Sequence, residues 1–351
     1  MKTASLLRNC WYLATQSHRL NRGQLLDRTI LGDPVVLGRG GDGKAFALRN
    51  VCPHRSMPLS YGSLQGCELQ CCYHGWKFNT GTGACMDIPS MSEEQNRQRL
   101  QAIKVRSYPV QEVQGNIWIF MSSETARDVG DVPPVPVLAA FPADAKPKVV
   151  ETIGVRCHLD QTVMGLMDPA HQAFVHTSWW MSTRQFTGRT ISKDYGPAPW
   201  GYRLIPNQQR KNARLYRLLG RNLTTEFSFQ LPSLRIEETR SDRHSVVQLT
   251  AITPINEGES VIHALFYWTP PWLAILHPAI RLMLKRFLKQ DRDIMLMQDA
   301  GLRHKSPQML VDDADTQSKW YLRLKQEYEK SQQEGRPFTN PVQPRTLQWR
   351  T

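Results

Sequence analysis

The 351-residue chain has no long hydrophobic segment. Its most apolar region, residues 261–288, is broken by prolines and basic residues. It therefore stays short of the roughly 18 uninterrupted apolar residues that a membrane-spanning helix needs. The first residues, Met1 to Arg8, also lack the apolar run of a secretory signal. We expect a protein without a membrane span, located in the cytoplasm.

The chain also lacks the sequence patterns of nucleic-acid-binding proteins. Its net charge is +13, but the basic residues are spread along the chain, without a zinc-finger, helix-turn-helix or RNP-like pattern. Nucleic acid is therefore not an expected partner. The charge fits a solvated surface or a docking face for an acidic electron-transfer protein. Four arginines recur at helical spacing: Arg210, Arg214, Arg217 and Arg221. They could form a solvated face, contact an acidic electron-transfer protein or bind an anionic substrate.

The seven cysteines are too few and too clustered for a disulfide framework. Four of them fall within 21 residues, together with two histidines: Cys52, Cys67, Cys71 and Cys72. In a chain without an export signal, this clustering favours a metal site over disulfides.

The first metal-binding pattern is Cys52-x-His54, sixteen residues, and then Cys71-x-x-His74. Two thiolates and two imidazoles could bind a single zinc ion. However, the close spacing of Cys52 and His54, and the Pro or Gly beside each pair, favour two facing β-loops that each offer one thiolate and one imidazole. A Rieske [2Fe–2S] cluster needs this set, with the two thiolates on one iron and the two imidazoles on the other.

A second pattern, Asp168-x-x-His171-x-x-x-x-His176, offers ligands for a mononuclear iron. Asp168 and His171 are three residues apart, which places them on one face of a helix. The two histidines lie about 140° apart on an ideal helix, so both reach one metal only if the helix ends or bends between them.

A non-haem Fe(II) oxygenase site needs a carboxylate as its third ligand. In the predicted helix over residues 278–300, Asp291 lies in the middle of an otherwise apolar face. An unpaired carboxylate there is costly, so a metal explains its position. A buried Asp that pairs with an arginine or caps a helix is the competing interpretation, and Asp299 is the second candidate ligand.

These motifs resemble those of Rieske non-haem iron oxygenases. Cys52-Pro-His54-Arg and Cys71-x-Tyr-His74-Gly-Trp are similar to the cluster motif of ring-hydroxylating and demethylating oxygenases. Respiratory Rieske proteins have an extra cysteine in each loop, where this chain has Met57 and Tyr73, and a serine in place of Trp76.

The segment from Gly165 to His176 resembles the iron-binding segment of the vanillate O-demethylase, dicamba monooxygenase and caffeine N-demethylase group, whose members usually have Asn in place of Gly165. The segment Phe287-Leu-Lys-Gln290-Asp291 resembles the one that supplies the carboxylate ligand in that group, with Gln290 in place of the usual Glu. The resemblance implies that Asp168 bridges His171 and a cluster histidine, His74, of the next subunit of a homotrimer.

The expected fold is α+β, with an all-β Rieske domain (1–125) and a helix-grip catalytic domain (126–351). Short β-type runs separated by glycines indicate the first domain, at 29–37, 45–48 and 116–121. A Pro- and Ala-rich segment, 129–147, predicts the connection. The second domain is expected to contain strands at 233–239, 245–252 and 259–269 and helices at 278–300 and 315–332, with Gly301 just past the first helix.

The resemblance implies a terminal oxygenase that activates O₂ at Fe²⁺ and hydroxylates or oxidatively demethylates a small, aromatic substrate. The chain has no dinucleotide-binding fingerprint and no plant-ferredoxin cysteine spacing, so electrons from NAD(P)H must arrive through a separate reductase or ferredoxin. An arene cis-dihydroxylase is the alternative within the class. A Rieske electron carrier and a zinc-binding interaction module are the alternatives outside it.

Overall fold

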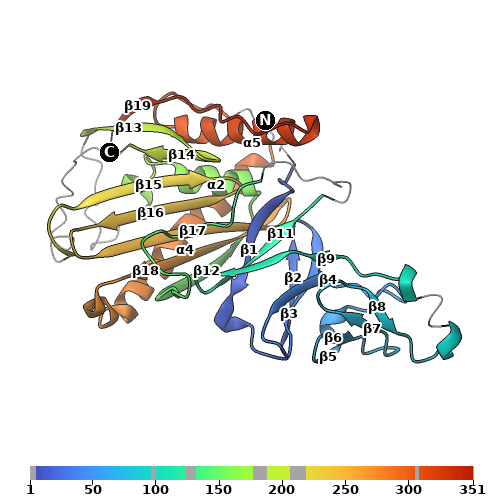
Figure 1. The fold of residues 1–351 in the computed structure, drawn as a ribbon. Helices are drawn as coiled ribbons and strands as arrows, with labels where there is room; N and C mark the ends of the chain where they lie inside the picture. The colour runs from blue at the N-terminus through green and yellow to red at the C-terminus, as the bar shows by residue number, and fades with distance from the viewer. Residues whose placement is uncertain are drawn as a thin grey trace.

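The computed structural model describes residues 5–95, 100–123, 132–176, 188–205, 219–304 and 308–350. It has an N-terminal part made of small antiparallel sheets and a larger part built on one eight-stranded sheet (Figure 1). In the described residues, no helix is both long enough and apolar enough to cross a membrane. The predicted α+β fold is confirmed.

Three small sheets form the N-terminal part. The first has the order β1-β11-β10 and consists of β1 (Cys10–Gln16), β10 (Val110–Val113) and β11 (Asn116–Met121). The second has the order β2-β3-β4-β9 and consists of β2 (Leu25–Ile30), β3 (Asp33–Arg39), β4 (Ala45–Arg49) and β9 (Ser107–Tyr108). The third runs in chain order through β5 (Ser63–Gln65), β6 (Glu68–Gln70), β7 (Lys77–Asn79) and β8 (Cys85–Asp87).

The predicted single strand at 29–37 is wrong, because a tight turn divides it. Leu31 and Gly32 both have positive φ angles, 52° and 80°, and Ile30 pairs directly with Asp33. Two consecutive residues with positive φ make the hairpin turn that suits the twist of antiparallel strands. The run is therefore the end of β2, a two-residue turn and the start of β3.

The large sheet is antiparallel throughout and has the order β12-β18-β17-β16-β15-β14-β13-β19. Its strands are β12 (Val149–Val155), β13 (Thr190–Ala198), β14 (Gly201–Leu204), β15 (Thr224–Gln230), β16 (Leu234–Arg240), β17 (Ser245–Asn256), β18 (Glu259–Trp268) and β19 (Arg345–Arg350). The three predicted strands are confirmed as β16, β17 and β18. The other five were not predicted.

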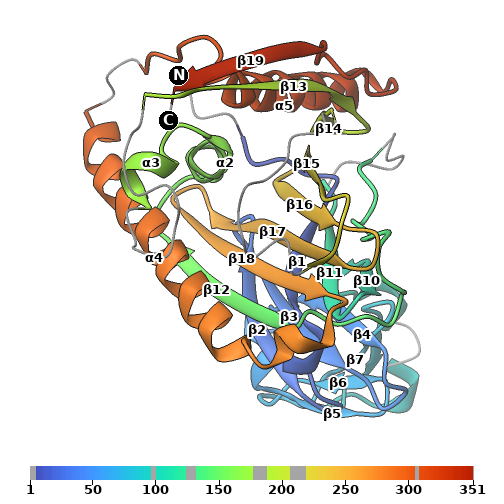
Figure 2. The ribbon, with the colours of Figure 1, turned by 90° about the vertical axis from the view of Figure 1, so that its left-hand side faces the viewer.

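The helices lie against this sheet, as Figure 2 shows. They are α2 (Leu159–Met167), α3 (Gln172–Val175), α4 (His277–Leu302) and α5 (Thr316–Glu334). Both predicted long helices are confirmed as α4 and α5, although α4 continues through Gly301. Helix α4 packs along β12 and contacts α2 and α3. It buries one face, which consists of Leu284, Leu288, Asp291 and Met295.

The two parts of the molecule share a hydrophobic core. Leu13 of β1 and Trp118 of β11 pack against Leu249 and Leu265 of the large sheet. The Thr253 hydroxyl donates to the carbonyl of Leu13 over 2.8 Å. The N-terminal sheet is therefore docked on the large sheet by both apolar packing and hydrogen bonds.

A buried ion pair fixes α2 to α5. The ammonium of Lys325, which has no exposed surface, donates to both carboxylate oxygens of Asp160, over 2.7 and 2.9 Å. The Tyr321 hydroxyl also donates to Asp160 over 2.6 Å. A buried charge pair is tolerated only when its hydrogen bonds are satisfied in this way. The pair sets the position of α2, the helix that leads into the histidine segment.

Candidate metal centres

The two histidines of the second pattern flank the single turn of α3. Helix α2 ends at Met167, and Asp168 follows with extended backbone angles. His171 stands at the start of α3 and His176 at its end, where φ and ψ are −95° and 67°. The helix break that the five-residue spacing required is therefore present. It turns both imidazoles toward α4.

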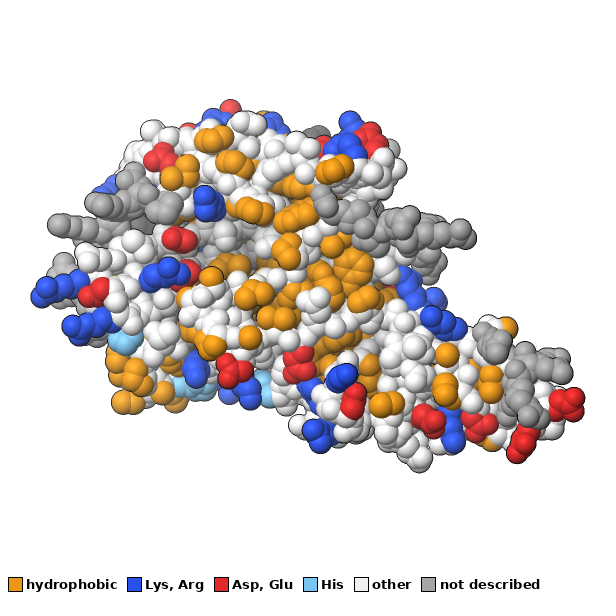
Figure 3. All heavy atoms as spheres, in the orientation of Figure 1, with side chains coloured by type: hydrophobic (Ala, Val, Ile, Leu, Met, Phe, Trp, Pro, Cys, Tyr) orange, Lys and Arg blue, Asp and Glu red, His pale blue; other side chains and the backbone are white. Residues whose placement is uncertain are grey.

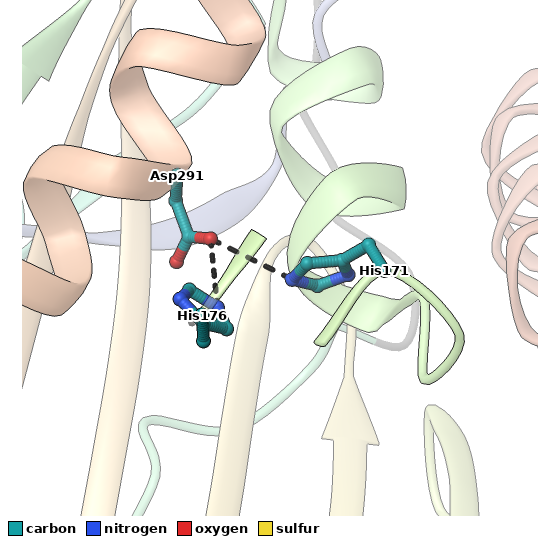
Figure 4. Close-up of side chains that lie close together, drawn as sticks. All are labelled: His171, His176 and Asp291. Carbon is teal, nitrogen blue, oxygen red and sulfur yellow. Dashed lines mark ion pairs between the residues drawn. The ribbon is translucent and has the colours of Figure 1, made fainter. Parts of the chain in front are cut away.

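Asp291 of α4 completes a three-residue cluster with these histidines (Figure 4). Its Oδ1 lies 3.1 Å from Nε2 of His176 and 3.5 Å from Nε2 of His171. One potential ligand atom from each of the three residues lies within 4.8 Å of the other two. Asp291 and His176 are buried, with 4% and 0% of their surfaces exposed. The three side chains thus face one point from two elements of the fold.

The outer nitrogens of both imidazoles have different neighbours. Nδ1 of His171 lies 3.6 Å from Oδ2 of Asp168, and Nδ1 of His176 lies 3.1 Å from Oε1 of Gln290. Phe287 stacks on the His176 ring at a centroid distance of 3.8 Å. Gln290 was noted in the sequence only as a departure from the usual Glu. Its contact with His176 could not be seen there, because the two residues are 114 positions apart.

Asp168 and His171 do not share a helix face, so that part of the prediction is wrong. Asp168 lies past the end of α2, and its Oδ1 accepts a hydrogen bond from the backbone N–H of Ala170 over 2.7 Å. This bond closes a tight turn, since an Asp side chain readily binds the backbone two residues further on. The turn, rather than a helix, brings the carboxylate to His171.

The charged groups of the cluster shift one another's pKa values toward the ionised forms. Burial opposes protonation of His171, but the carboxylates of Asp168 and Asp291 outweigh it and raise the pKa of His171 to about 9. Burial opposes ionisation of Asp291, but His171 and His176 keep the pKa of its carboxyl below its usual range. Asp291 is therefore held as a carboxylate, the form that binds a metal.

The donor set fits a divalent cation. Oδ2 of Asp291 is buried and has no hydrogen-bond partner among the described residues, which is costly for a carboxylate oxygen unless a cation is bound. Two imidazoles and one carboxylate that leave other positions open are the facial set of non-haem Fe(II) oxygenases. The competing interpretation was an Asp that pairs with an arginine or caps a helix. Asp291 instead lies in the interior of α4, and the two histidines are its ion-pair partners among the described residues.

The two loops of the first pattern repeat one hydrogen-bonding scheme. The N–H of Cys52 donates to the carbonyl of Met57, and the N–H of Ser56 donates back to Cys52. In the second loop, the N–H of Cys71 donates to Trp76, and that of Gly75 donates back to Cys71. The fourth residue after each cysteine has a positive φ angle, 55° at Ser56 and 73° at Gly75. The chain thus forms two equivalent β-loops, as the spacing predicted.

The loops bring the four candidate ligands together. The rings of His54 and His74 lie 4.4 Å apart, while Cys52 and Cys71 are buried below them. Burial, together with the neighbouring Cys71 thiol, raises the pKa of the Cys52 thiol to about 11. Buried thiols beside one exposed and one half-buried imidazole fit a Rieske cluster, because the metal would compensate the thiolate charge and the imidazoles would bind the outer iron.

Comparisons with known proteins agree with this geometry. A family model described as the Rieske [2Fe-2S] domain matches residues 10–109. This part of the chain is a Rieske domain.

The relatives of the chain are named as oxygenases. Dicamba O-demethylase, oxygenase component, of Stenotrophomonas maltophilia is 37% identical over 176 residues, which cover 49% of this chain and 48% of the relative. The 4beta-methylsterol monooxygenase of Methylococcus capsulatus is 32% identical over 178 residues, which cover 49% of this chain and 46% of the relative. The chain thus spans about half the length of the curated relatives that it matches.

A solved structure shows the same fold over nearly the whole chain. The NdmA QL mutant of Pseudomonas putida CBB5, solved with theobromine, has a TM-score of 0.70 and 18% sequence identity, and the match covers 95% of this chain and 94% of that one. The likeness extends through the Rieske domain and the large sheet. It shows the fold of both parts.

Trp76 supports the outer edge of the Rieske domain's ligand loops. Its indole stacks on His54 with a centroid distance of 4.8 Å and an interplanar angle of 6°. The ring of Tyr73 contacts that of His74 in a tilted arrangement, with a centroid distance of 3.9 Å. The sequence marked Trp76 only as the residue that replaces a serine of respiratory Rieske proteins. Its role in holding an imidazole follows from the fold of the loop.

Asp299 and a buried histidine, His263, lie away from the metal cluster. Asp299, the second candidate ligand, forms an ion pair with Arg303 at 2.7 Å. His263 is buried on β18, opposite Thr152, whose hydroxyl is 3.3 Å from its Nδ1. It shares its sheet face with Leu265 and Tyr267, which pack toward the Rieske domain. His263 is therefore a core residue.

Some predictions fall on residues that the structure does not describe. The aromatic residues that follow His176 in the sequence, Trp179, Trp180 and Phe186, lie outside the described residues. The same holds for the predicted basic helix up to residue 218. Gly165 is described and lies on α2, where an added Cβ would be 3.1 Å from the Met295 methyl of α4. An Asn side chain at position 165, as in the group that this segment resembles, would therefore lie next to Met295.

Proposed function

We propose that this chain is the terminal oxygenase component of a multicomponent Rieske oxygenase. The observation that carries the proposal is the convergence of His171, His176 and Asp291 in a chain that also has a Rieske domain. A Rieske cluster supplies electrons one at a time, and a ferrous ion at a two-His, one-carboxylate site supplies open positions for O₂. Together they are the parts that an O₂-activating enzyme needs.

In this proposal each side chain has a definite task. Cys52 and Cys71 hold one iron of the [2Fe–2S] cluster, and His54 and His74 hold the other. His171, His176 and Asp291 hold Fe²⁺. The Rieske domain is assigned to residues 1–125 and the catalytic domain to 126–351. The seven cysteines are all free, which supports a reducing, cytoplasmic setting for the protein.

Asp168 is the proposed electron bridge. Its Oδ2 faces the outer nitrogen of His171, the position from which a carboxylate orients a metal-bound imidazole. The proposed second contact of this carboxylate is His74 of the next subunit. The exposed histidine edge of the Rieske domain supports this arrangement, since His54 is exposed and His74 is half-buried.

The proposed assembly is a homotrimer, which the position of the two centres supports. Figure 2 shows α3 beside α2 and α4 in the upper half of the molecule, whereas β5 and β6, from the sheet that adjoins the cluster loops, lie at the bottom. A head-to-tail ring would place the cluster of one subunit beside the mononuclear site of its neighbour, through a heterologous interface that closes on itself. Light scattering at micromolar concentration tests this. A fully active monomer would contradict it.

The proposed reaction is hydroxylation or oxidative demethylation of a small aromatic substrate. The names of the relatives, a dicamba O-demethylase and a 4beta-methylsterol monooxygenase, support monooxygenation but differ in substrate. Electrons from NAD(P)H arrive through a separate reductase or ferredoxin. Figure 3 shows Lys and Arg side chains scattered over one face with acidic residues among them, so the described residues of this face form no single basic patch for such a partner. Arene cis-dihydroxylation remains the alternative reaction.

An iron assay combined with one substitution tests the proposal. The oxygenase should contain about three iron atoms per chain, two of them in the cluster, and show the red-brown colour of a Rieske protein. The Asp291→Ala variant should keep the visible Rieske spectrum, contain about two iron atoms and lose product formation. Products are screened with a surrogate reductase and a panel of aromatic acids, methyl ethers and N-methyl compounds.

Three outcomes would contradict the assignment. A wild-type protein with only two iron atoms per chain and no oxidation product would favour the electron carrier. Normal turnover and iron content in Asp291→Ala would show that another group is the third ligand. A colourless protein with zinc in place of iron would favour the zinc-binding module.

A further inference from the structure

Three side chains of α4 contact the imidazole of His176. Phe287 covers one face of the ring at a centroid distance of 3.8 Å. Asp291 faces Nε2 at 3.1 Å, and the amide of Gln290 faces Nδ1 with its Oε1 at 3.1 Å. His176 has no exposed surface. The ring is thus held from its face and from both nitrogens by residues within two turns of one helix.

The protonation of Nδ1 decides whether His176 can bind a metal. A neutral imidazole has one N–H and one nitrogen with a free lone pair. An acceptor at Nδ1 keeps the proton there and leaves the lone pair of Nε2 directed at the metal. The Gln290 carbonyl is such an acceptor. Its distance from Nδ1, 3.1 Å, is within the ordinary range for a hydrogen bond from nitrogen to oxygen.

The two histidines of the site differ in the charge behind them. Nδ1 of His171 faces the carboxylate of Asp168, whereas Nδ1 of His176 faces a neutral amide. A carboxylate behind an imidazole makes it a stronger ligand and adds a negative charge beside the metal. The neutral amide can orient the His176 imidazole without adding a negative charge beside the metal.

We propose that Gln290 is a positioning residue for His176: its carbonyl accepts the Nδ1 proton of the imidazole, so that Nε2 faces the metal, and it does so without adding charge. This inference rests on the proposed function, since it takes His176 as a metal ligand. Gln290 itself has no contact with the metal. It acts only through the orientation and tautomer of His176.

The test measures metal affinity, which does not depend on turnover. The mononuclear site of the purified, cluster-containing protein is emptied with a chelator and titrated anaerobically with Co²⁺, and the cobalt absorption bands give the dissociation constant. Gln290→Leu keeps the volume but removes the acceptor. It should weaken Co²⁺ binding about 10- to 100-fold, the usual effect of losing a group that orients a ligand.

Gln290→Glu is the rescue variant, because a carboxylate restores the acceptor at Nδ1. It should bind Co²⁺ at least as tightly as the wild type, and the added charge should make binding tighter. Gln298→Leu, at an exposed position of the same helix, is the matched control and should bind normally. Circular dichroism and the Rieske spectrum show that each variant is folded. If Gln290→Leu does not fold, Gln290→Met replaces it.

The outcomes separate this inference from the proposed function. If Gln290→Leu binds Co²⁺ within about threefold of the wild type while His176→Ala loses binding, the positioning role of Gln290 is wrong and the metal site stands. If Gln290→Glu binds more weakly than Gln290→Leu, the acceptor argument is also overturned. If His176→Ala binds Co²⁺ like the wild type, the metal site itself is misassigned, and the proposed function fails with it.

Discussion

The two candidate metal centres of this chain are built in opposite ways. The Rieske loops lie close together in the sequence, repeat one backbone scheme, and present their histidines at the surface. The mononuclear site is buried and joins a short segment after α2 to the middle of α4. A centre made of local loops depends on turn geometry, whereas a centre made of distant helices depends on how those helices pack. The two should therefore respond to different mutations.

The largest expected effect is at the proposed connection between the centres. Asp168→Asn keeps the side-chain size but removes the charge that holds the outer N–H of His171 and, in the proposed trimer, of His74. We expect an intact trimer and a cluster that the reductase still reduces, but no electron passage to the mononuclear iron. Single turnover measures this: the protein is reduced, mixed with substrate and O₂, and cluster reoxidation is followed. Reoxidation at the wild-type rate with product formed would rule out the bridge.

The second prediction separates the centres through packing. Lys325→Met leaves Asp160 buried without its cation, which typically costs about 3–5 kcal/mol. Because Asp160 begins α2, we expect weaker mononuclear metal binding with an unchanged Rieske spectrum. The matched control is Lys330→Met on the same helix, where the pair with Glu334 is exposed and loosely spaced at 3.9 Å. An exposed pair contributes about 0–1 kcal/mol. Equal urea midpoints for the two variants would contradict the prediction.

The third prediction concerns the junction between the Rieske domain and the large sheet. Burial, with the nearby charges of Arg19 and Arg28, lowers the pKa of His263 to about 3. Its ordinary value is about 6.5, so the unfolded chain takes up a proton that the folded chain refuses, and stability falls as the pH drops below about 6.5. Between pH 7 and pH 5 this group should cost about 2 kcal/mol.

His263→Gln removes that titration and keeps a polar partner for Thr152. Urea unfolding at pH 7 and pH 5 should show a smaller loss of stability in the variant than in the wild type, by about the same 2 kcal/mol. An equal loss in both proteins would show that His263 titrates normally in the folded state. Because both centres depend on this junction, acid should affect them together.

The smallest expected effect is on the cluster loops alone. Gly75 has a φ angle of 73°, and an added Cβ would lie 3.1 Å from Pro89. Gly75→Ala should therefore cost about 1–2 kcal/mol and shorten the lifetime of the visible Rieske absorption in urea, without changing mononuclear metal binding. Gly66→Ala is the control: its φ angle is also positive, at 59°, but its Cβ would have no neighbour within 4 Å. Equal cluster loss in both variants would exclude a specific effect on the ligand loop.

The sequence by itself determined the ligand types and the order of the two centres. Cys52, His54, Cys71 and His74 are close enough in the chain for their spacing alone to indicate two facing loops, since turn geometry is a local property. Asp291 could be selected because a carboxylate on an apolar helix face needs a partner. The long helices α4 and α5 were predictable for the same reason, because their buried faces repeat with the helical period.

Only the tertiary structure decided which side chains meet over long distances. The contacts of Gln290 with His176 and of Lys325 with Asp160 join residues 114 and 165 positions apart. No local pattern encodes either contact, since both depend on how α4 and α5 pack against the segment around α2. The turn that divides β2 from β3 was also missed, because Leu31 takes a left-handed conformation that is rare for a side chain of its kind. Local chemistry therefore indicated the candidate ligands, and packing decided which residues contact them.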